Sequence, residues 1–292
     1  MIKKIICPAK INLFLEINGK RESDGYHTLD TVMQTISLAD TVTVRLEKGI
    51  GHVNAFVDGL SSCVPADDRN IAVKAAKKYL DAFGIRGYDV AIMIEKRIPV
   101  MAGLGGGSAD AAGVLRALES LFSFGEEGQL AQLALSLGAD VPFCFNTGAC
   151  RAQGIGEILT PCTEMPKDTY IVIAKGEKGV STAEAYRQLD MQGENIIKSA
   201  DSMIESLNKC DLSFTSHLFN RFEDVVLPEL SEARDIKRIL CEKGSIGSLM
   251  SGSGSAVFAI FENDASASAA LDELRDLGVF ACKSRPFSIA DF

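Results

Sequence analysis

One short segment contains four glycines within five positions, and it constrains this chain more than any other feature. A strand-like run, 88–96, precedes the segment, and a helix-forming run, 108–122, follows it. Because glycine lacks Cβ, backbone N–H groups can close around a compact anion there. The partly positive N-terminus of the following helix points to the same place. We therefore predict a phosphate-binding loop made of Gly103, Leu104, Gly105, Gly106, Gly107 and Ser108.

Two well-known phosphate loops do not match this segment. A Walker A loop ends in Gly-Lys-Ser or Gly-Lys-Thr, whereas Ser108 follows the glycines here without a lysine. A dinucleotide-binding fingerprint that starts at Gly103 requires glycine at position 108. The alternative without a ligand is a glycine-rich turn. For Ser108 two roles stay open: its side chain caps the following helix, or its hydroxyl contacts a Mg²⁺ ion on bound phosphate.

The composition narrows the class of partner. The 292 residues are long enough for two lobes, and the net charge is −9. This acidity argues against DNA or RNA as a partner, because their binding depends on many lysine and arginine contacts. A small phosphorylated ligand needs only a local cluster of donors.

No segment approaches the roughly 20 apolar residues of a membrane helix. Because Pro8 and Lys10 interrupt the first apolar run, we expect no signal peptide and a cytoplasmic protein. The oligomeric state stays open.

The cysteines and histidines favour neither disulfides nor zinc. The eight cysteines are scattered without any Cys-x-x-Cys pair, and most lie in apolar runs. They predict buried free thiols in a reducing compartment. The three histidines lie far from any pair of cysteines, which argues against a zinc site.

Strand-like and helix-like patterns alternate along the chain and predict a mixed α+β fold. Strands are expected at 2–6, 11–17, 41–46, 53–57, 88–96, 169–175, 256–261 and 279–284. Helices are expected at 69–83, 108–122, 126–137, from 181 onward, over the stretch 194–222, and at 227–242 and 265–277. Pro161 and Pro166 mark a boundary between lobes.

Three blocks of sequence together resemble the GHMP small-molecule kinases. The blocks are Pro8-Ala9-Lys10-Ile11-Asn12, the glycine segment 99–108, and the turn Ser251-Gly252-Ser253-Gly254-Ser255. Taken alone, the third block is explained as well by a tight turn as by a ligand site. The resemblance implies an ATP-dependent phosphotransferase with two lobes. It implies a mixed βα nucleotide-binding lobe with the catalytic residues at 1–160 and a ferredoxin-like lobe at 161–292.

Further motifs resemble one branch of that family, which acts on a cytidine-diphosphate-linked methylerythritol. The most specific is Lys20-Arg21-x-x-Asp24-Gly25-Tyr26-His27, and the segments 138–143 and 154–157 add to it. The resemblance covers nearly the whole chain in the expected order. It implies transfer of the γ-phosphate of ATP, with Mg²⁺, to the 2-hydroxyl of that substrate on the methylerythritol phosphate route to isoprenoid precursors. One departure is Ala109, where this branch often has serine.

Two residues are candidates for the chemistry itself. Asp140 is the predicted base, because a carboxylate can take the hydroxyl proton as the O–P bond forms. The alternative is an ordinary turn aspartate before Val141-Pro142. Lys10 lies among apolar strand residues, so its ammonium needs a partner, and a pair with Asp140 would keep that carboxylate ionised. The alternative for Lys10 is a surface lysine on an edge strand.

The remaining candidates bind the two nucleotides. Tyr26 can stack on a pyrimidine and His27 can meet its edge, although a lone histidine is more often a hydrogen-bonded loop residue. The resemblance implies further contacts: Tyr186 on the other face of the cytosine, backbone contacts from Ile155, and Asn12 on the polyol or phosphate. For the adenosine it implies Asn70, Ile71 and Lys96, each of which also has an ordinary structural alternative.

Two other functions stay open from the sequence. One is another GHMP kinase with a smaller alcohol as its substrate, of the homoserine or mevalonate type. The other is a non-catalytic nucleotide-binding relative that kept the fold.

Overall fold

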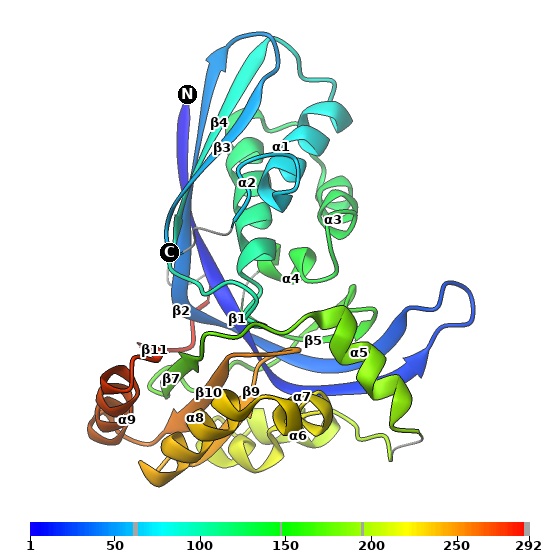
Figure 1. Cartoon of the computed structure of the whole chain (residues 1–292). Coiled ribbons are helices and arrows are strands. Elements are labelled where there is room, and N and C mark those ends of the chain that lie inside the picture. The colour runs from blue at the N-terminus through cyan, green and yellow to red at the C-terminus, as the bar shows by residue number, and fades with distance from the viewer. Residues whose placement is uncertain (61–63, 147, 194–195, 289–292) are drawn as a thin grey trace. The chain divides into compact units, whose positions relative to one another are not determined.

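The computed structural model describes residues 1–60, 64–146, 148–193 and 196–288, and the chain forms two compact units. Unit 1 comprises Met1–Ala9, Ala39–Val100 and Gly105–Asn146, and unit 2 comprises Lys10–Leu38, Met101–Leu104 and Thr147–Phe292. Two long strands, β1 (Ile2–Lys20) and β2 (His27–Lys48), contribute residues to both units (Figure 1). The sequence predicted two short strands in place of β1 and only the second half of β2, because residues 27–38 show no clean alternation.

Unit 1 is a sheet covered by helices. Strand β3 (Val53–Gly59) pairs in parallel with β4 (Tyr88–Lys96), and β4 pairs antiparallel with the second half of β2. Every other residue of β4 is buried, so one face of this strand meets the core. The helices of unit 1 are α1 (Ile71–Ala82), α2 (Gly106–Phe122), α3 (Glu127–Leu135) and α4 (Val141–Asn146).

Helix α2 packs closely because its residues are small. A Cβ at Gly113 would lie 2.2 Å from Sγ of Cys7, so no larger residue fits between the helix and β1 there. Ala111 and Ala112 are fully buried on the same helix, and α1 packs alongside. This packing fixes the direction in which the N-terminus of α2 points.

Unit 2 contains two groups of strands. In the first, β1 pairs in parallel with β8 (Phe219–Asn220), β2 pairs antiparallel with β5 (Ala149–Gly154), and β5 pairs with β6 (Ile158–Pro161). The second is an antiparallel sheet in the order β11-β7-β10-β9. Its strands are β7 (Tyr170–Lys175), β9 (Gly247–Met250), β10 (Val257–Phe261) and β11 (Phe280–Ser284).

This antiparallel sheet has the ferredoxin-like arrangement. The last strand, β11, lies beside the first, β7, and β10 lies between β7 and β9. Helices α8 (Ser231–Glu242) and α9 (Asp264–Asp276) pack on it (Figure 1). The other helical segments of unit 2 are α5 (Thr182–Met191), α6 (Asp201–Leu207), a 3₁₀ helix (Leu212–His217) and α7 (Glu223–Glu229). The predicted α+β class and ferredoxin-like C-terminal lobe are confirmed.

Two helix predictions are wrong. The run 194–222 is not one helix: it contains α6, the 3₁₀ helix and β8, while residues 194 and 195 lie outside the described part. Asp211 has an extended backbone, which interrupts any continuous helix there. Its side chain accepts a hydrogen bond from Ser213 N and so caps the 3₁₀ helix. The run 227–242 spans two helices, α7 and α8, which meet at Leu230 two residues after Pro228.

The cysteines in the described part of the chain are free thiols, and Cys63 lies outside that part. Three of them, Cys7, Cys144 and Cys150, are buried, whereas Cys210 and Cys241 are exposed. The prediction that the cysteines are buried is therefore correct for only some of them. Across residues 1–60, 64–146, 148–193 and 196–288, no helix has the length and apolarity needed to cross a membrane.

Candidate active site

The glycine loop leads directly into α2. The helix begins at Gly106, and its N-cap is Gly105, whose φ of +70° favours glycine. The first N–H groups of a helix have no partner within the helix, so this end presents backbone donors to an anion. Ser108 lies inside the first turn and makes no cap hydrogen bond, so its predicted capping role is wrong. The other role, contact of the Ser108 hydroxyl with Mg²⁺ on bound phosphate, stays a prediction.

The residues predicted for adenosine lie next to this loop in unit 1. A Cβ on Gly107 would lie 3.5 Å from Cγ2 of Ile71, and one on Gly106 would lie 3.3 Å from Nζ of Lys96. Asn70 is the N-cap of α1, since its side chain accepts a hydrogen bond from Ala72 N at 2.9 Å. The fold thus brings these three residues together with the second half of the loop.

Lys96 is also the centre of a buried ion cluster. Its Nζ donates to Oδ2 of Asp40 at 2.5 Å and to Oδ2 of Asp110 at 2.8 Å, and the three side chains are 0–4% exposed. Asp40 also accepts the backbone N–H groups of Arg97 and Ile98 through Oδ1. We call Asp40, Lys96 and Asp110 the buried triad. It ties β2, the end of β4 and the start of α2 together beneath the loop.

The triad holds one lysine against two carboxyl groups, and the pKa values shift accordingly. Burial alone would lower the pKa of Lys96, but Asp110 and Asp40 outweigh it and raise this pKa. Burial raises the pKa of Asp110 to about 7, although the Lys96 ammonium opposes that rise. Oδ1 of Asp110 has no hydrogen-bond partner among the described residues. Asp110 is thus the member whose charge is least well compensated.

Replacing Asp110 by asparagine is expected to flatten the pH dependence of stability. Because the pKa of Asp110 is raised in the folded chain, the folded state holds its proton longer than the unfolded state. The contribution of Asp110 is therefore complete below about pH 4 and is lost as the pH rises through about 7. The free energy of unfolding of Asp110→Asn should fall less between these limits than that of the wild type. Urea denaturation at a series of pH values measures both slopes, and equal slopes would contradict the assignment.

The glycine-serine turn of unit 2 packs against the first residue of the loop. Oγ of Ser251 donates to the carbonyl oxygen of Gly103 at 3.0 Å. A Cβ on Gly103 would lie 1.9 Å from Ser251 O, and one on Gly252 would lie 3.1 Å from Gly103 O. The φ values are +74° for Gly103 and +55° for Gly252. Both positions need glycine because two backbone segments approach each other directly.

Lys10 and Asn12 belong to the same part of unit 2. Nζ of Lys10 lies 3.4 Å from the position of a Cβ on Gly252 and donates to Oδ1 of Asn12 at 2.7 Å. Nδ2 of Asn12 donates to Oγ1 of Thr31 at 2.9 Å. Lys10 is buried, so the alternative of a surface lysine is wrong. This chain of bonds fixes the ammonium beside the glycine-serine turn.

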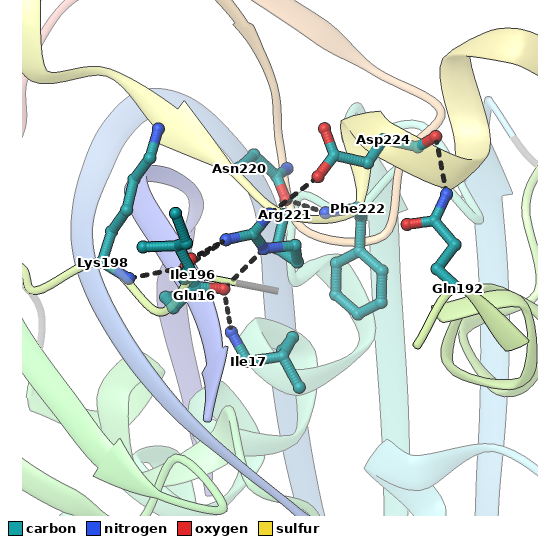
Figure 2. Close-up of polar contacts among 9 residues, drawn as sticks. All are labelled: Glu16, Ile17, Gln192, Ile196, Lys198, Asn220, Arg221, Phe222 and Asp224. Atoms are coloured by element: carbon teal, nitrogen blue, oxygen red, sulfur yellow. Dashed lines mark hydrogen bonds and ion pairs between the residues drawn. The ribbon is translucent and has the colours of Figure 1, made fainter. Parts of the chain in front are cut away.

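Asn220 also holds the glycine-serine turn, and the sequence did not single it out. Its Nδ2 donates to the carbonyl oxygens of Met250 at 2.6 Å and Gly252 at 2.8 Å. Figure 2 shows the next residue, Arg221, fixed by a two-point ion pair with Glu16 at 2.7 and 2.6 Å. The backbone of β8 therefore has little freedom, and Asn220 acts as a rigid support for the turn.

The predicted cytosine residues lie in unit 2, at the β1–β2 hairpin and on α5. Tyr26 is 62% exposed. The imidazole of His27 stacks on the Tyr186 ring, with centroids 4.3 Å apart and planes 17° apart. Nε2 of His27 lies 2.8 Å from Oδ1 of Asp190. One face of Tyr186 is thus covered by His27, and stacking of Tyr186 on a cytosine stays a prediction.

Two predicted residues have roles that the structure describes only in part. Asp140 directly precedes α4, whose second residue is Pro142, so it lies at an element boundary as expected. Its predicted pairing with Lys10 stays a prediction, because the two residues belong to different units. Ile155 lies in a tight turn where its own N–H donates to Glu157, so the backbone contact predicted for Ile155 also stays a prediction.

Four site residues were missed: Asp40, Asp110, Asp190 and Asn220. Asp110 had a usable signal, because it is the single charged residue in the first two turns of a helix of small residues. The other three had none, because each meets its partner only through long-range contacts. Asp190, for example, lies 163 residues from His27 along the chain.

Comparisons with known proteins find similar sequences and similar folds over nearly the whole chain. Residues 70–148 match the model of the GHMP kinases N terminal domain, and residues 196–279 match that of the GHMP kinases C terminal domain. A 4-diphosphocytidyl-2-C-methyl-D-erythritol kinase of Clostridium beijerinckii is 40% identical over 275 residues, which cover 93% of this chain and 95% of that protein. A crystal structure of 4-(cytidine 5'-diphospho)-2C-methyl-D-erythritol kinase superposes with a TM-score of 0.77 at 34% identity, covering 98% of this chain and 100% of that one. The mevalonate kinase of L. major reaches a TM-score of 0.76 at 17% identity, covering 98% of this chain and 97% of that one, and shares the fold alone.

Proposed function

This chain belongs to the GHMP kinase family, and we propose how its residues divide the work of moving a phosphoryl group from ATP to an alcohol. The chain is an ATP-dependent 4-diphosphocytidyl-2-C-methyl-D-erythritol kinase of the methylerythritol phosphate pathway. The observation that carries this conclusion is 40% identity over 93% of the chain to an enzyme of that name. The acceptor oxygen we assign is the 2-hydroxyl.

The glycine loop holds the triphosphate in our proposal. Gly103 and Leu104 begin it, and the N–H groups of Gly105–Ser108 face the β- and γ-phosphates at the start of α2. Among the described residues no three acidic, histidine or cysteine side chains form a metal cluster. We assign to the Ser108 hydroxyl, in the first turn of α2, the protein contact with a Mg²⁺ ion that arrives with the nucleotide. When bound, Mg²⁺ neutralises charge on the phosphates.

Asp140 accepts the proton of the acceptor hydroxyl as the new O–P bond forms and the bond to the leaving ADP breaks. Lys10 supplies a fixed positive charge beside the reacting oxygens, held by Asn12 and buried next to the glycine-serine turn. Asn12 contacts the polyol or phosphate of the substrate from the same strand.

In our proposal one group of residues binds the cytosine of the substrate and another group binds the adenosine of ATP. Tyr26, His27 and Tyr186 recognise the cytosine, and the turn at Ile155 lies against the substrate. The adenosine lies near Asn70, Ile71 and Lys96. The Nζ of Lys96 is already bonded to Asp40 and Asp110. Lys96 therefore acts on the nucleotide through its backbone and through the packing of its Nζ against Gly106.

We also propose the lobe boundary and the compartment. The nucleotide-binding and catalytic lobe spans residues 1–160, and the C-terminal lobe spans 161–292. A cytoplasmic enzyme agrees with the free thiols in the described part of the chain, since reduced cysteines are typical of that compartment.

Tyr26→Ala is expected to raise the KM for the cytidine substrate while leaving the KM for ATP nearly unchanged. Loss of one base-stacking contact weakens binding by about 1–3 kcal/mol, or roughly fivefold to 150-fold. The exposed position of Tyr26 argues against a folding defect as the cause of that change. Steady-state kinetics with each substrate varied in turn measure both constants. A matched rise in both would contradict the stacking role.

A panel of alcohols tests the function itself. With ATP and Mg²⁺ we expect ADP release with 4-diphosphocytidyl-2-C-methyl-D-erythritol and none above background with homoserine or mevalonate. Turnover of homoserine or mevalonate alone would favour another GHMP kinase. Absence of ADP release with every alcohol, while ATP still binds, would favour a non-catalytic relative.

A further inference from the structure

Asp190 lies between two residues of the substrate motif, and nothing in the proposed chemistry uses it. It belongs to the last turn of α5, whereas Lys20 and His27 end and begin the strands of the β1–β2 hairpin. Oδ2 of Asp190 accepts a hydrogen bond from Nζ of Lys20 at 2.6 Å, and Oδ1 lies 2.8 Å from Nε2 of His27. Each carboxylate oxygen therefore has its own partner.

The bond to Asp190 determines which ring nitrogen of His27 carries the proton. Burial alone would raise the pKa of Asp190, but the hydrogen bonds from Lys20 and His27 outweigh it and hold this pKa below its usual range. An ionised carboxylate only accepts hydrogen bonds, so Nε2 must be the protonated nitrogen. In the neutral ring Nδ1 is then an acceptor. Tyr186 covers one face of the imidazole, which fixes the orientation of the ring.

We propose that Asp190 is a specificity-determining residue that makes Nδ1 of His27 a hydrogen-bond acceptor and thereby selects cytosine over uracil. This inference rests on the proposed role of His27 at the base. The 4-amino group of cytosine donates hydrogen bonds, whereas uracil has an acceptor oxygen at the same position. An acceptor on His27 therefore pairs with cytosine and faces another acceptor in uracil. Asp190 touches neither base, so it is a positioning residue.

Asp190→Asn is the sharpest variant, because Lys20 dictates how the new amide must lie. The Lys20 ammonium can only donate, so it holds the oxygen of the introduced amide, and the NH₂ group of that amide faces His27. Nε2 must then accept, and the proton moves to Nδ1. The variant is expected to invert the tautomer and place a donor where cytosine also presents a donor. A second variant, Asp190→Ala, removes the contact without imposing the other tautomer.

Two measurements test whether the His27 tautomer is inverted in Asp190→Asn and whether the choice of base changes with it. Nitrogen-15 NMR at about pH 8, well above the usual histidine pKa of about 6.5, reports which nitrogen of His27 is protonated. CDP and UDP, used as competitive inhibitors against the cytidine substrate, report the choice of base. In Asp190→Asn we expect the NMR signature of a protonated Nδ1. We also expect the preference for CDP over UDP to fall by at least about tenfold, since a mismatched hydrogen bond at a positioned site is strongly disfavoured. In Asp190→Ala, CDP should weaken more than UDP.

Glu184→Gln is the matched control, because Glu184 is an exposed carboxylate of the same helix that pairs with Arg187 outside the site. It should leave both the His27 tautomer and the CDP/UDP ratio unchanged. An unchanged tautomer in Asp190→Asn would overturn the proposal. So would an equal loss of CDP and UDP binding, since that pattern indicates a purely structural role.

The test also separates this inference from the function on which it rests. If the wild type does not phosphorylate the cytidine substrate, the proposed function fails before any variant is made. If the wild type is active and binds CDP and UDP equally, the cytosine selection fails while the kinase activity stands.

Discussion

Asp140→Asn is expected to lower kcat by two or more orders of magnitude while ATP binds nearly as well as in the wild type. The amide has the shape of the carboxylate but cannot take a proton, and general base catalysis contributes roughly 10²- to 10⁴-fold. The donors for the phosphates come from the loop and the start of α2, which the substitution leaves in place. Steady-state kinetics give kcat, and calorimetric titration with a non-hydrolysable ATP analogue gives the affinity.

Asp68→Asn serves as the control for this variant. Asp68 is an exposed carboxylate of the same unit that pairs with Lys77, so its loss should leave both measurements unchanged. Full activity of Asp140→Asn would remove Asp140 from the base role. A parallel loss of activity and of ATP affinity would instead assign Asp140 to nucleotide binding.

Lys96→Met is expected to lower the free energy of unfolding by about 3–5 kcal/mol, because it leaves two buried carboxyl groups without their cation. Asp40 and Asp110 are 0% and 4% exposed in their ion pairs with Lys96, so water cannot replace the lost charge. The start of α2 should also loosen, since the triad fixes it beneath Gly106. Denaturation by urea measures the stability, and hydrogen exchange of the first turn of α2 measures the loosening.

Two further variants show whether the charge itself is responsible. Lys4→Met removes an exposed lysine that lies 3.5 Å from Glu95, with side chains 62% and 48% exposed, so it should change stability by less than about 1 kcal/mol. Adding Asp110→Asn to Lys96→Met should recover part of the loss, because one uncompensated carboxyl becomes neutral. A loss below about 1 kcal/mol in Lys96→Met, or no recovery in the double variant, would contradict this account.

Local patterns predicted the elements that depend on near neighbours. The helix after the glycine loop was expected at 108–122 and is observed at Gly106–Phe122, because its small residues favour one packed face over four turns. The prediction failed where distant contacts define an element. Strand β8 has two residues and exists through its pairing with Phe14 and Leu15 of β1, which no local pattern records.

The same division holds within the site. The glycine loop, Asp140, Lys10 and the Tyr26–His27 motif each stand out by residue type and spacing in the sequence. Their supports do not: Asp40 lies 56 residues from Lys96, and Asn220 lies 30 residues from Met250. A side chain that acts by hydrogen-bonding to a distant backbone or charge leaves no periodic signal, so the residues that position the chemistry stayed hidden.

By itself the sequence determined the α+β class and the family, because these depend on local residue patterns and short motifs, and its glycine content predicts phosphate binding at residues 103–108. Only the tertiary structure decided that Lys96 is buried between two carboxyl groups and that Asp190 lies within hydrogen-bond distance of Nε2 of His27. The physical reason is that the charge and proton position of an ionisable group depend on neighbours within a few ångströms. The fold, and not the order of residues along the chain, chooses those neighbours.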